Sequence, residues 1–197
     1  MSLSTPALSA PAPRRHLHTR TIACEGFLRD DGLWDIEARI IDTKTYAYSE
    51  VERGTRAIGS HVHDMWIRLT LDTSMVVRNI ETSMLSNPYE FCLSAQPAYK
   101  KLIGAKVGSG WRKAVNEAVG GDKGCTHVRE LLFPMATVAF QTISGWREDG
   151  TKADSQINSP PLNAQGLPYF VGGCKAWAAD SPVTRREYPQ FFIKAQS

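Results

Sequence analysis

The feature that most constrains the fold is an alternation of apolar and polar side chains over residues 65–72, within a predicted strand at 62–72 in the stretch "GSHVHDMWIRLTLD". The apolar positions in this run are Met65, Ile67, Leu69 and Leu71. Because side chains of a β-strand point alternately to its two faces, the pattern predicts a strand with one buried face. A chain with such a strand needs further strands beside it and a second layer to cover the apolar side.

Neighbouring segments supply the further strands. Residues 17–29 and 33–42 are predicted strands that flank the turn signal "DDG", since Asp and Gly tolerate the tight backbone of a reversal. Residues 76–85 follow the short turn "DTSMV" and predict a return strand, while residues 49–60 are polar and predict a loop. The sequence therefore predicts an antiparallel meander of three or more strands.

The pattern then becomes helical. Three segments have helical spacing of apolar residues or helix-ending glycines, namely 87–104, 109–121 and 125–145. Asn87 is the expected N-cap of the first, and Pro97 should kink it. The predicted fold class is α+β, an antiparallel meander with helices packed on one face. A further strand is expected at 169–177, after a polar loop.

Domain organisation follows from length and composition. The chain has 197 residues and is 42% hydrophobic, which predicts one α+β domain over residues 16–197. Residues 1–15 are rich in Ser, Ala and Pro and are expected to be a disordered leader. The net charge of +3 is too small to favour a nucleic-acid partner, and no apolar run is long enough to predict a membrane span. Four widely spaced cysteines and the lack of an export signal favour reduced thiols and a cytoplasmic location.

Three of the five histidines form the candidate site. His61 and His63 are two positions apart, so strand alternation places both on the buried face, at its end. His127 lies in "GCTHVREL" at the first turn of a predicted helix, with Cys125 before it and Glu130 one turn later. These groups could act as base, orienting carboxylate and nucleophile or ligand. The alternative is ordinary: rim histidines and a Cys/Thr helix cap.

Charged and aromatic residues extend the candidate site. Asp31 and Glu37 are candidate acids or bases, and Arg29 could hold an anionic substrate group. The alternative for this stretch is a charged turn that fixes a hairpin. Candidate walls for an aromatic substrate are Trp34, Trp66, Tyr89 and Trp111.

Several motifs, taken together, carry a family resemblance. They are "FLRDDGLWDIEARIIDTK", "HVHDMWIRLTLD", "PYEFC", "LIGAKVGSGW" and "GCTHVREL". The chain resembles, over residues 17–192, the bacterial family called domain of unknown function 2889, to which no activity is assigned.

A more distant resemblance, to the IscU/NifU iron–sulfur scaffold and SufE group, implies an IscU/SufE-like core with extra N- and C-terminal segments. In that group, metal or sulfur ligands come from three places. Here those places hold His61 with His63, the Pro88–Cys92 region, and Cys125 with His127. The thiolate triad of the scaffold pattern is absent.

These residues are compatible with three functions. The first is a small-molecule enzyme of bacterial catabolism, a cofactor-independent acid–base lyase acting on an aromatic or ring-containing substrate. Its base would be a histidine of the 61/63 pair, with His127 in the same pocket and Glu37 or Glu130 as the orienting carboxylate. The second is a carrier of a divalent metal or iron–sulfur cluster, held by His61, His63, Cys125 and His127. The third is an accessory subunit. A homo-oligomer is also considered.

Overall fold

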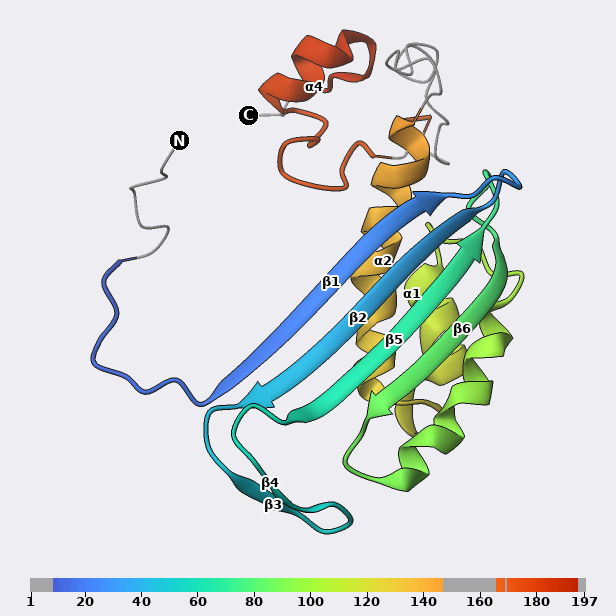
Figure 1. Ribbon diagram of the computed structural model, residues 1–197. Coiled ribbons are helices and arrows are strands. Elements are labelled where there is room, and N and C mark those ends of the chain that lie inside the picture. Colours follow the sequence, from blue (N-terminus) through green and yellow to red (C-terminus); the bar gives the residue numbers. More distant parts are fainter. Residues whose placement is uncertain (1–8, 147–165, 169, 195–197) are drawn as a thin grey trace. The chain divides into compact units, whose positions relative to one another are not determined.

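A four-stranded antiparallel sheet organises the larger of two compact units, Met1–Ile143 and Ser144–Ser197. The computed structural model describes residues 9–146, 166–168 and 170–194. The sheet order is β1–β2–β5–β6 (Figure 1), with β1 at His18–Leu28, β2 at Trp34–Lys44, β5 at His61–Leu71 and β6 at Val77–Ser86. The predicted antiparallel meander is thus confirmed, with four strands in the sheet.

The two faces of the sheet differ as the alternation predicts. On β5, the side chains of Met65, Ile67, Leu69 and Leu71 are all buried. On β2, every second residue from Trp34 to Asp42 is buried. These positions define the core face of the sheet. The opposite face, here called the open face, carries Asp64, Trp66 and Arg68 on β5.

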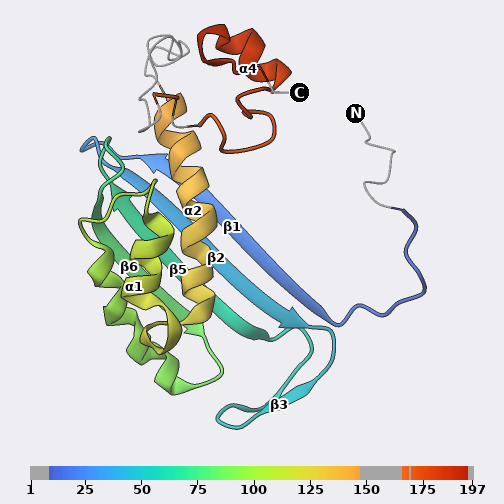
Figure 2. The same ribbon diagram turned by 180° about the vertical axis from the view of Figure 1, so that it is seen from behind.

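Helices cover the core face, as Figure 2 shows from behind. They are η1 at Glu90–Leu102, α1 at Trp111–Val119, the short η2 at Gly121–Lys123, and α2 at Thr126–Gly145. Buried apolar residues of η1, α1 and α2 join those of β2, β5 and β6 in one core cluster. The predicted α+β class with helices on one face is confirmed.

One glycine lets α2 approach β1 closely. A Cβ atom on Gly26 would lie 2.0 Å from Oγ1 and 2.8 Å from Cβ of Thr142 on α2. No side chain fits at that distance, so glycine is required where the helix crosses the edge strand. This contact fixes the far end of α2 against the sheet and so constrains the direction of its N-terminus.

Two predicted elements of the first unit differ from the structure. The helix predicted at 87–104 is a 3₁₀ helix that begins at Glu90, and Asn87 is not its cap; Tyr89 is, with no side-chain cap bond. Pro97 lies inside it and lacks the N–H that a regular α-helix would use there. The predicted loop at 49–60 contains a small hairpin, β3 at Tyr48–Glu50 and β4 at Gly54–Arg56.

The second unit has its own small core. Its elements are α4 at Pro182–Glu187 and η3 at Pro189–Phe191, and Ser181 caps α4 by accepting the Thr184 N–H at 3.0 Å. The rings of Phe170, Trp177 and Tyr188 pack on one another. The strand expected at 169–177 is wrong for its described residues: 170–177 form turns, because paired glycines at 172–173 allow the chain to fold back on itself.

At the other end of the chain, residues 9–17 are exposed and have no regular secondary structure, and the rest of the expected leader lies outside the described residues. Among the described residues, no helix is both long and apolar enough to cross a bilayer.

Candidate functional site

A row of polar side chains crosses the core face at one end of the sheet. Arg20 on β1 pairs with Asp42 on β2, and Asp42 pairs with His63 on β5. The next row inward, Ile22–Ile40–Met65, is apolar. The polar row therefore lies where the hydrophobic core ends, and Asp42 is fully buried there.

Four hydrogen bonds saturate the Asp42 carboxylate. Its Oδ1 accepts from Nε2 of His18 at 2.9 Å and from Nε of Arg20 at 2.8 Å. Its Oδ2 accepts from Nη2 of Arg20 at 2.8 Å and from Nδ1 of His63 at 2.9 Å. A carboxylate offers about four lone-pair sites, so no lone pair of Asp42 remains to accept a further hydrogen bond.

The hydrogen bonds decide the ionisation of Asp42. Burial alone would raise its pKa, but the hydrogen bonds from Arg20, His63 and His18 outweigh burial and hold the pKa well below its usual range. Asp42 is thus an anion that can only accept, which requires His63 to carry its proton on Nδ1. Nε2 of His63 is left with a free lone pair.

His63 itself is mostly buried, and its pKa is lowered. Burial is the main cause, assisted by the positive charges of Arg20 and Arg53 and opposed by Asp42. Because Arg20 already balances the charge of Asp42, the carboxylate orients the His63 ring without making it a permanent cation. This is the arrangement that makes an imidazole a base or a ligand at neutral pH.

The first turn of α2 places His127 against His63. Their ring centroids are 3.7 Å apart, with 32° between the ring planes. Burial, together with the charges of His63 and Arg20, lowers the pKa of His127 to about 4. Nδ1 of His127 lies 3.8 Å from Sγ of Cys125. Two stacked imidazoles repel each other when both are charged, so the pair holds at most one positive charge near neutral pH.

Both histidines line a cavity of about 640 Å³. Its other walls come from the start of η1, including Tyr89, Phe91 and Cys92, and from the chain entering α2, including Cys125. Tyr99 secures that chain, because its hydroxyl donates to the Cys125 carbonyl at 2.8 Å. The cavity size suits a small organic molecule. We refer to it as the histidine cavity.

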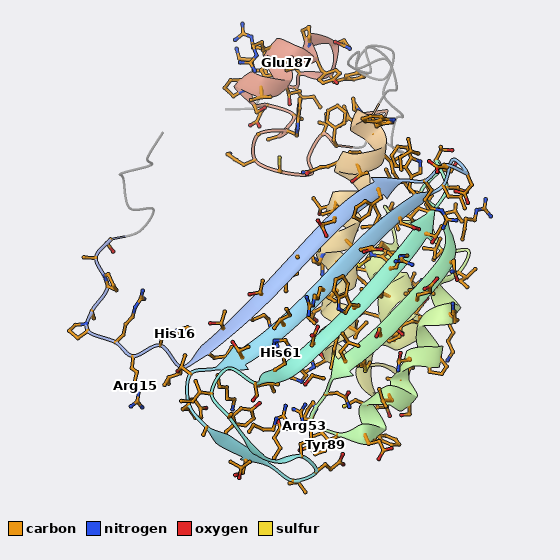
Figure 3. All side chains as sticks on the ribbon, viewed as in Figure 1. Arg15, His16, Arg53, His61, Tyr89 and Glu187 are labelled. Carbon is orange, nitrogen blue, oxygen red and sulfur yellow. The ribbon has the colours of Figure 1, made fainter. Side chains whose placement is uncertain are left out.

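The β3–β4 hairpin supports the mouth of the histidine cavity. Glu52, between its strands, lines the cavity and accepts the Glu90 N–H at the start of η1 at 2.6 Å. Arg53 donates to Oγ of Ser86 at 2.7 Å and to the Val62 carbonyl at 3.1 Å. Figure 3 labels Arg53, His61 and Tyr89 at this end of the sheet.

His61 does not join the cavity, contrary to the expectation that it shares a face with His63. The pairing shifts between Asp42 and Thr43, so that His63 faces Asp42 while His61 faces Thr43. This irregularity inserts one extra residue and reverses the alternation before His63. Nδ1 of His61 instead lies 3.2 Å from Asp64, which points to the open face.

Two of the predicted aromatic walls are core residues. Trp34 is 6% exposed and Trp111 is 3% exposed, and both belong to the hydrophobic core. Nε1 of Trp111 donates to the Leu132 carbonyl of α2 at 2.8 Å. Trp66 is on the open face under the Arg39 guanidinium, 4.8 Å from its ring centroid. Of the four predicted walls, only Tyr89 lines the histidine cavity.

The predicted carboxylates and Arg29 lie elsewhere. Arg29 and Asp31 form an exposed ion pair at 2.7 Å in the β1–β2 turn, at the opposite end of the strands from Asp42. Eleven-residue strands separate these ends by roughly 30 Å. Glu37 is on the open face and accepts from Arg68 at 2.7 Å. For Arg29 and Asp31, the structure therefore agrees with the alternative interpretation, a charged turn that joins two strands of a hairpin.

Glu130 is close to the site but is not its orienting group. It is exposed and pairs with Arg129 at 3.1 Å, and its charge acts on Arg20 and His127. The orienting carboxylate is Asp42, which the sequence reasoning missed. A signal for it exists: Asp42 continues the series Trp34, Ile36, Ala38, Ile40 and therefore falls on the core face.

The structure also bears on metal binding. Among the described residues, Asp42, His63 and His127 form a group whose ligand atoms lie within 4.8 Å of one another. Arg20, His18 and His63 already occupy every acceptor of Asp42, and the Arg20 cation would repel a metal ion. A zinc site needs three or four protein ligands, so this donor set does not fit one as it stands.

The fold and the site define an α+β protein with a buried Asp–His pair at the edge of a small cavity. The chain belongs to the family described as "Protein of unknown function (DUF2889)", whose model matches residues 18–141. That match covers the whole sheet, η1, α1 and nearly all of α2, and so includes every residue of the site. No curated protein and no solved structure matches the chain.

Proposed function

We propose that this chain is a small-molecule enzyme that performs cofactor-independent acid–base chemistry in the histidine cavity. The observation that carries the proposal is the buried Asp42–His63 pair, with Nδ1 of His63 2.9 Å from Asp42 and the exposed Arg20 completing the row. A fixed, neutral imidazole with a free Nε2 beside a cavity is the form of a general base. A positioned base of this kind contributes roughly 10²–10⁴-fold to a rate.

The reaction class that we propose is elimination or addition, that is, a lyase acting on an aromatic or ring-containing substrate. We propose an aromatic substrate because the rings of Tyr89 and Phe91 and the apolar Pro88 lie in the cavity wall. In this scheme Nε2 of His63 takes a proton from a substrate O–H or activated C–H group and returns it to the leaving or added group. Asp42 orients the ring and stabilises the imidazolium while the proton is held.

The test is a search for turnover with purified protein and no added cofactor. A panel of uncharged aromatic alcohols, ketones and phenolic ethers is incubated with the wild type, and products are detected by mass spectrometry. His63→Gln keeps much of the volume and hydrogen bonding but cannot act as a base in the same way. We expect it to lower turnover at least 10²-fold. His61→Gln, the same change two positions away on the open face, should leave turnover unchanged.

Equal rates for the wild type and His63→Gln would contradict the proposal.

The second candidate, a metal or cluster carrier, is favoured by the approach of His63, His127 and Cys125 at one cavity. Elemental analysis of the purified protein separates the two candidates. A stoichiometric metal that is lost in both His63→Gln and His127→Gln would support the carrier.

A further inference from the structure

The second histidine of the cavity has a surrounding that differs from that of His63. His63 has an anionic carboxylate on Nδ1, whereas His127 has only the Cys125 thiol, 3.8 Å from its Nδ1. A thiol has one proton, and an imidazole nitrogen is a far better acceptor for it than the Met65 thioether, 3.9 Å away. The Cys125 S–H therefore donates to Nδ1, which leaves the proton of neutral His127 on Nε2.

His127 also lies at the first turn of α2, a helix of 20 residues. The N-terminus of such a helix carries a partial positive charge from its unpaired N–H groups. Gly124 and Cys125, which lead into the helix, and Thr126, its first residue, line the same cavity. An oxygen that gains negative charge next to His127 would be stabilised both by a ring N–H and by the helix terminus, whereas an imidazolium would be disfavoured there.

We propose, building on the function above, that His127 is a second catalytic residue: a neutral hydrogen-bond donor to the substrate oxygen that becomes negative when His63 removes a proton. The two histidines then have complementary roles, with His63 as acceptor and His127 as donor. Their ring centroids are 3.7 Å apart and both rings line the same cavity, so the two side chains can face one hydroxyl group. In the step, the substrate O–H bond breaks, an N–H bond forms at Nε2 of His63, and the electron pair stays on oxygen.

The charges of the cavity narrow the class of substrate. Besides the two histidines, its lining contains two carboxylates, Glu52 and Asp122, and one ammonium group, Lys123. The Arg20 guanidinium is not part of the lining and is committed to Asp42. A substrate with a carboxylate or phosphate would meet a net negative wall. The substrate class that fits is an uncharged phenol, whose ring lies against Tyr89 and Phe91 and whose hydroxyl reaches the histidine pair.

The experiment uses 4-nitrophenol as the probe, because its phenolate is coloured and its ionisation can be followed by absorbance. The full chain is titrated with the probe over a range of pH. We expect bound 4-nitrophenol to ionise with an apparent acid constant at least tenfold above that of the free probe. 4-Nitrobenzoate, which is similar in size but anionic, should bind at least tenfold more weakly.

Variants assign the effect to each residue. His127→Phe keeps a ring stacked on His63 but removes the donor, so it should abolish most of the shift, roughly tenfold to a hundredfold in the acid constant. His61→Phe, an equal change on the open face, should not alter it. Ala95→Trp, which fills the cavity, should prevent binding and shows that the probe occupies this site.

The outcomes separate the two proposals. An unchanged shift in His127→Phe, together with a lost shift in His63→Gln, would overturn the role of His127 and leave the base intact. An unchanged shift in His63→Gln would overturn the proposed function itself. Failure of 4-nitrophenol to bind, or equal binding of 4-nitrobenzoate, would overturn the uncharged phenol as the substrate class.

Discussion

The low pKa of His127 predicts a measurable dependence of stability on pH. In the unfolded chain a histidine titrates near its ordinary value of 6.5, whereas in the folded protein the pKa of His127 is about 4. Between these values the unfolded state binds more protons, so acidification favours unfolding. The difference of about 2.5 units, at 1.36 kcal/mol per unit, amounts to about 3 kcal/mol of unfolding free energy.

The sign follows from the direction of the shift. Because folding lowers the pKa of His127, the folded protein loses stability relative to the unfolded chain only at pH values where the histidine of the unfolded chain binds a proton. Stability should therefore be full above about pH 6.5 and should fall as the pH drops toward 4. Burial lowers the pKa of His63 as well, which adds a loss of stability in the same direction, below the ordinary histidine value.

The assay is urea denaturation followed by circular dichroism at several pH values between 7 and 4.5. His127→Phe keeps a ring beside His63 but has no proton to bind, so its unfolding free energy should fall by about 2 kcal/mol less than that of the wild type over this range. An unchanged denaturant slope shows that the unfolded state has stayed the same. Parallel curves for the two proteins would refute the reasoning, since His127 would then titrate alike in both states.

Two further predictions concern how the fold positions the site. Gly26→Ala should destabilise the protein by about 1–3 kcal/mol, because the new Cβ meets both Oγ1 and Cβ of Thr142 and no rotation of that side chain relieves both contacts. Thermal unfolding measures this loss. Adding Thr142→Ala to the Gly26→Ala variant should recover part of the lost stability. If Thr142→Ala recovers none of the lost stability, the strain does not come from the contact with Thr142. Tyr99→Phe should cost only about 0.5–1.5 kcal/mol, because the Cys125 carbonyl keeps its helical bond from Arg129 at 2.9 Å. A much larger loss would show that Tyr99 does more than secure the start of α2.

The fold could be read from the sequence where the side-chain period is regular. Alternation along β2 and β5 predicted both the strands and their buried face, because one face of a half-buried strand must be apolar. The same rule failed at His61. A β-bulge depends on how two strands meet, and nothing in "SHVHD" marks the extra residue.

The candidate site was predicted in part. His63 and His127 come together because strand alternation and helix position each place them at the same end of the core. The sequence favours a carboxylate with polar neighbours, such as Glu37, as the orienting group, whereas Asp42 belongs to an apolar series. The ionisation of Asp42 depends on hydrogen bonds from Arg20 and His18 of the neighbouring strand β1. These residues are 22 and 24 positions away from Asp42 in the sequence.

Trp34 and Trp111 show another limit. Indole rings suit a ligand cavity and a hydrophobic core equally well, and only the packing of α2 decides that these two belong to the core. The irregular η1 is a third case, since the sequence predicted a helix there but not its 3₁₀ form.

Whether Asp42 prepares His63 as a base can be observed from the tautomer of His63, by ¹⁵N–¹H correlation of the imidazole nitrogens at neutral pH. We expect a neutral ring with its proton on Nδ1, where Asp42 accepts it, and no proton on Nε2. In Asp42→Asn the amide can donate to Nδ1, so the proton should move to Nε2 and turnover should fall by several orders of magnitude, as expected for a base in the wrong tautomer. A wild-type His63 that carries its proton on Nε2, or a tautomer that Asp42→Asn does not change, would contradict the central claim that Asp42 prepares His63 as a base.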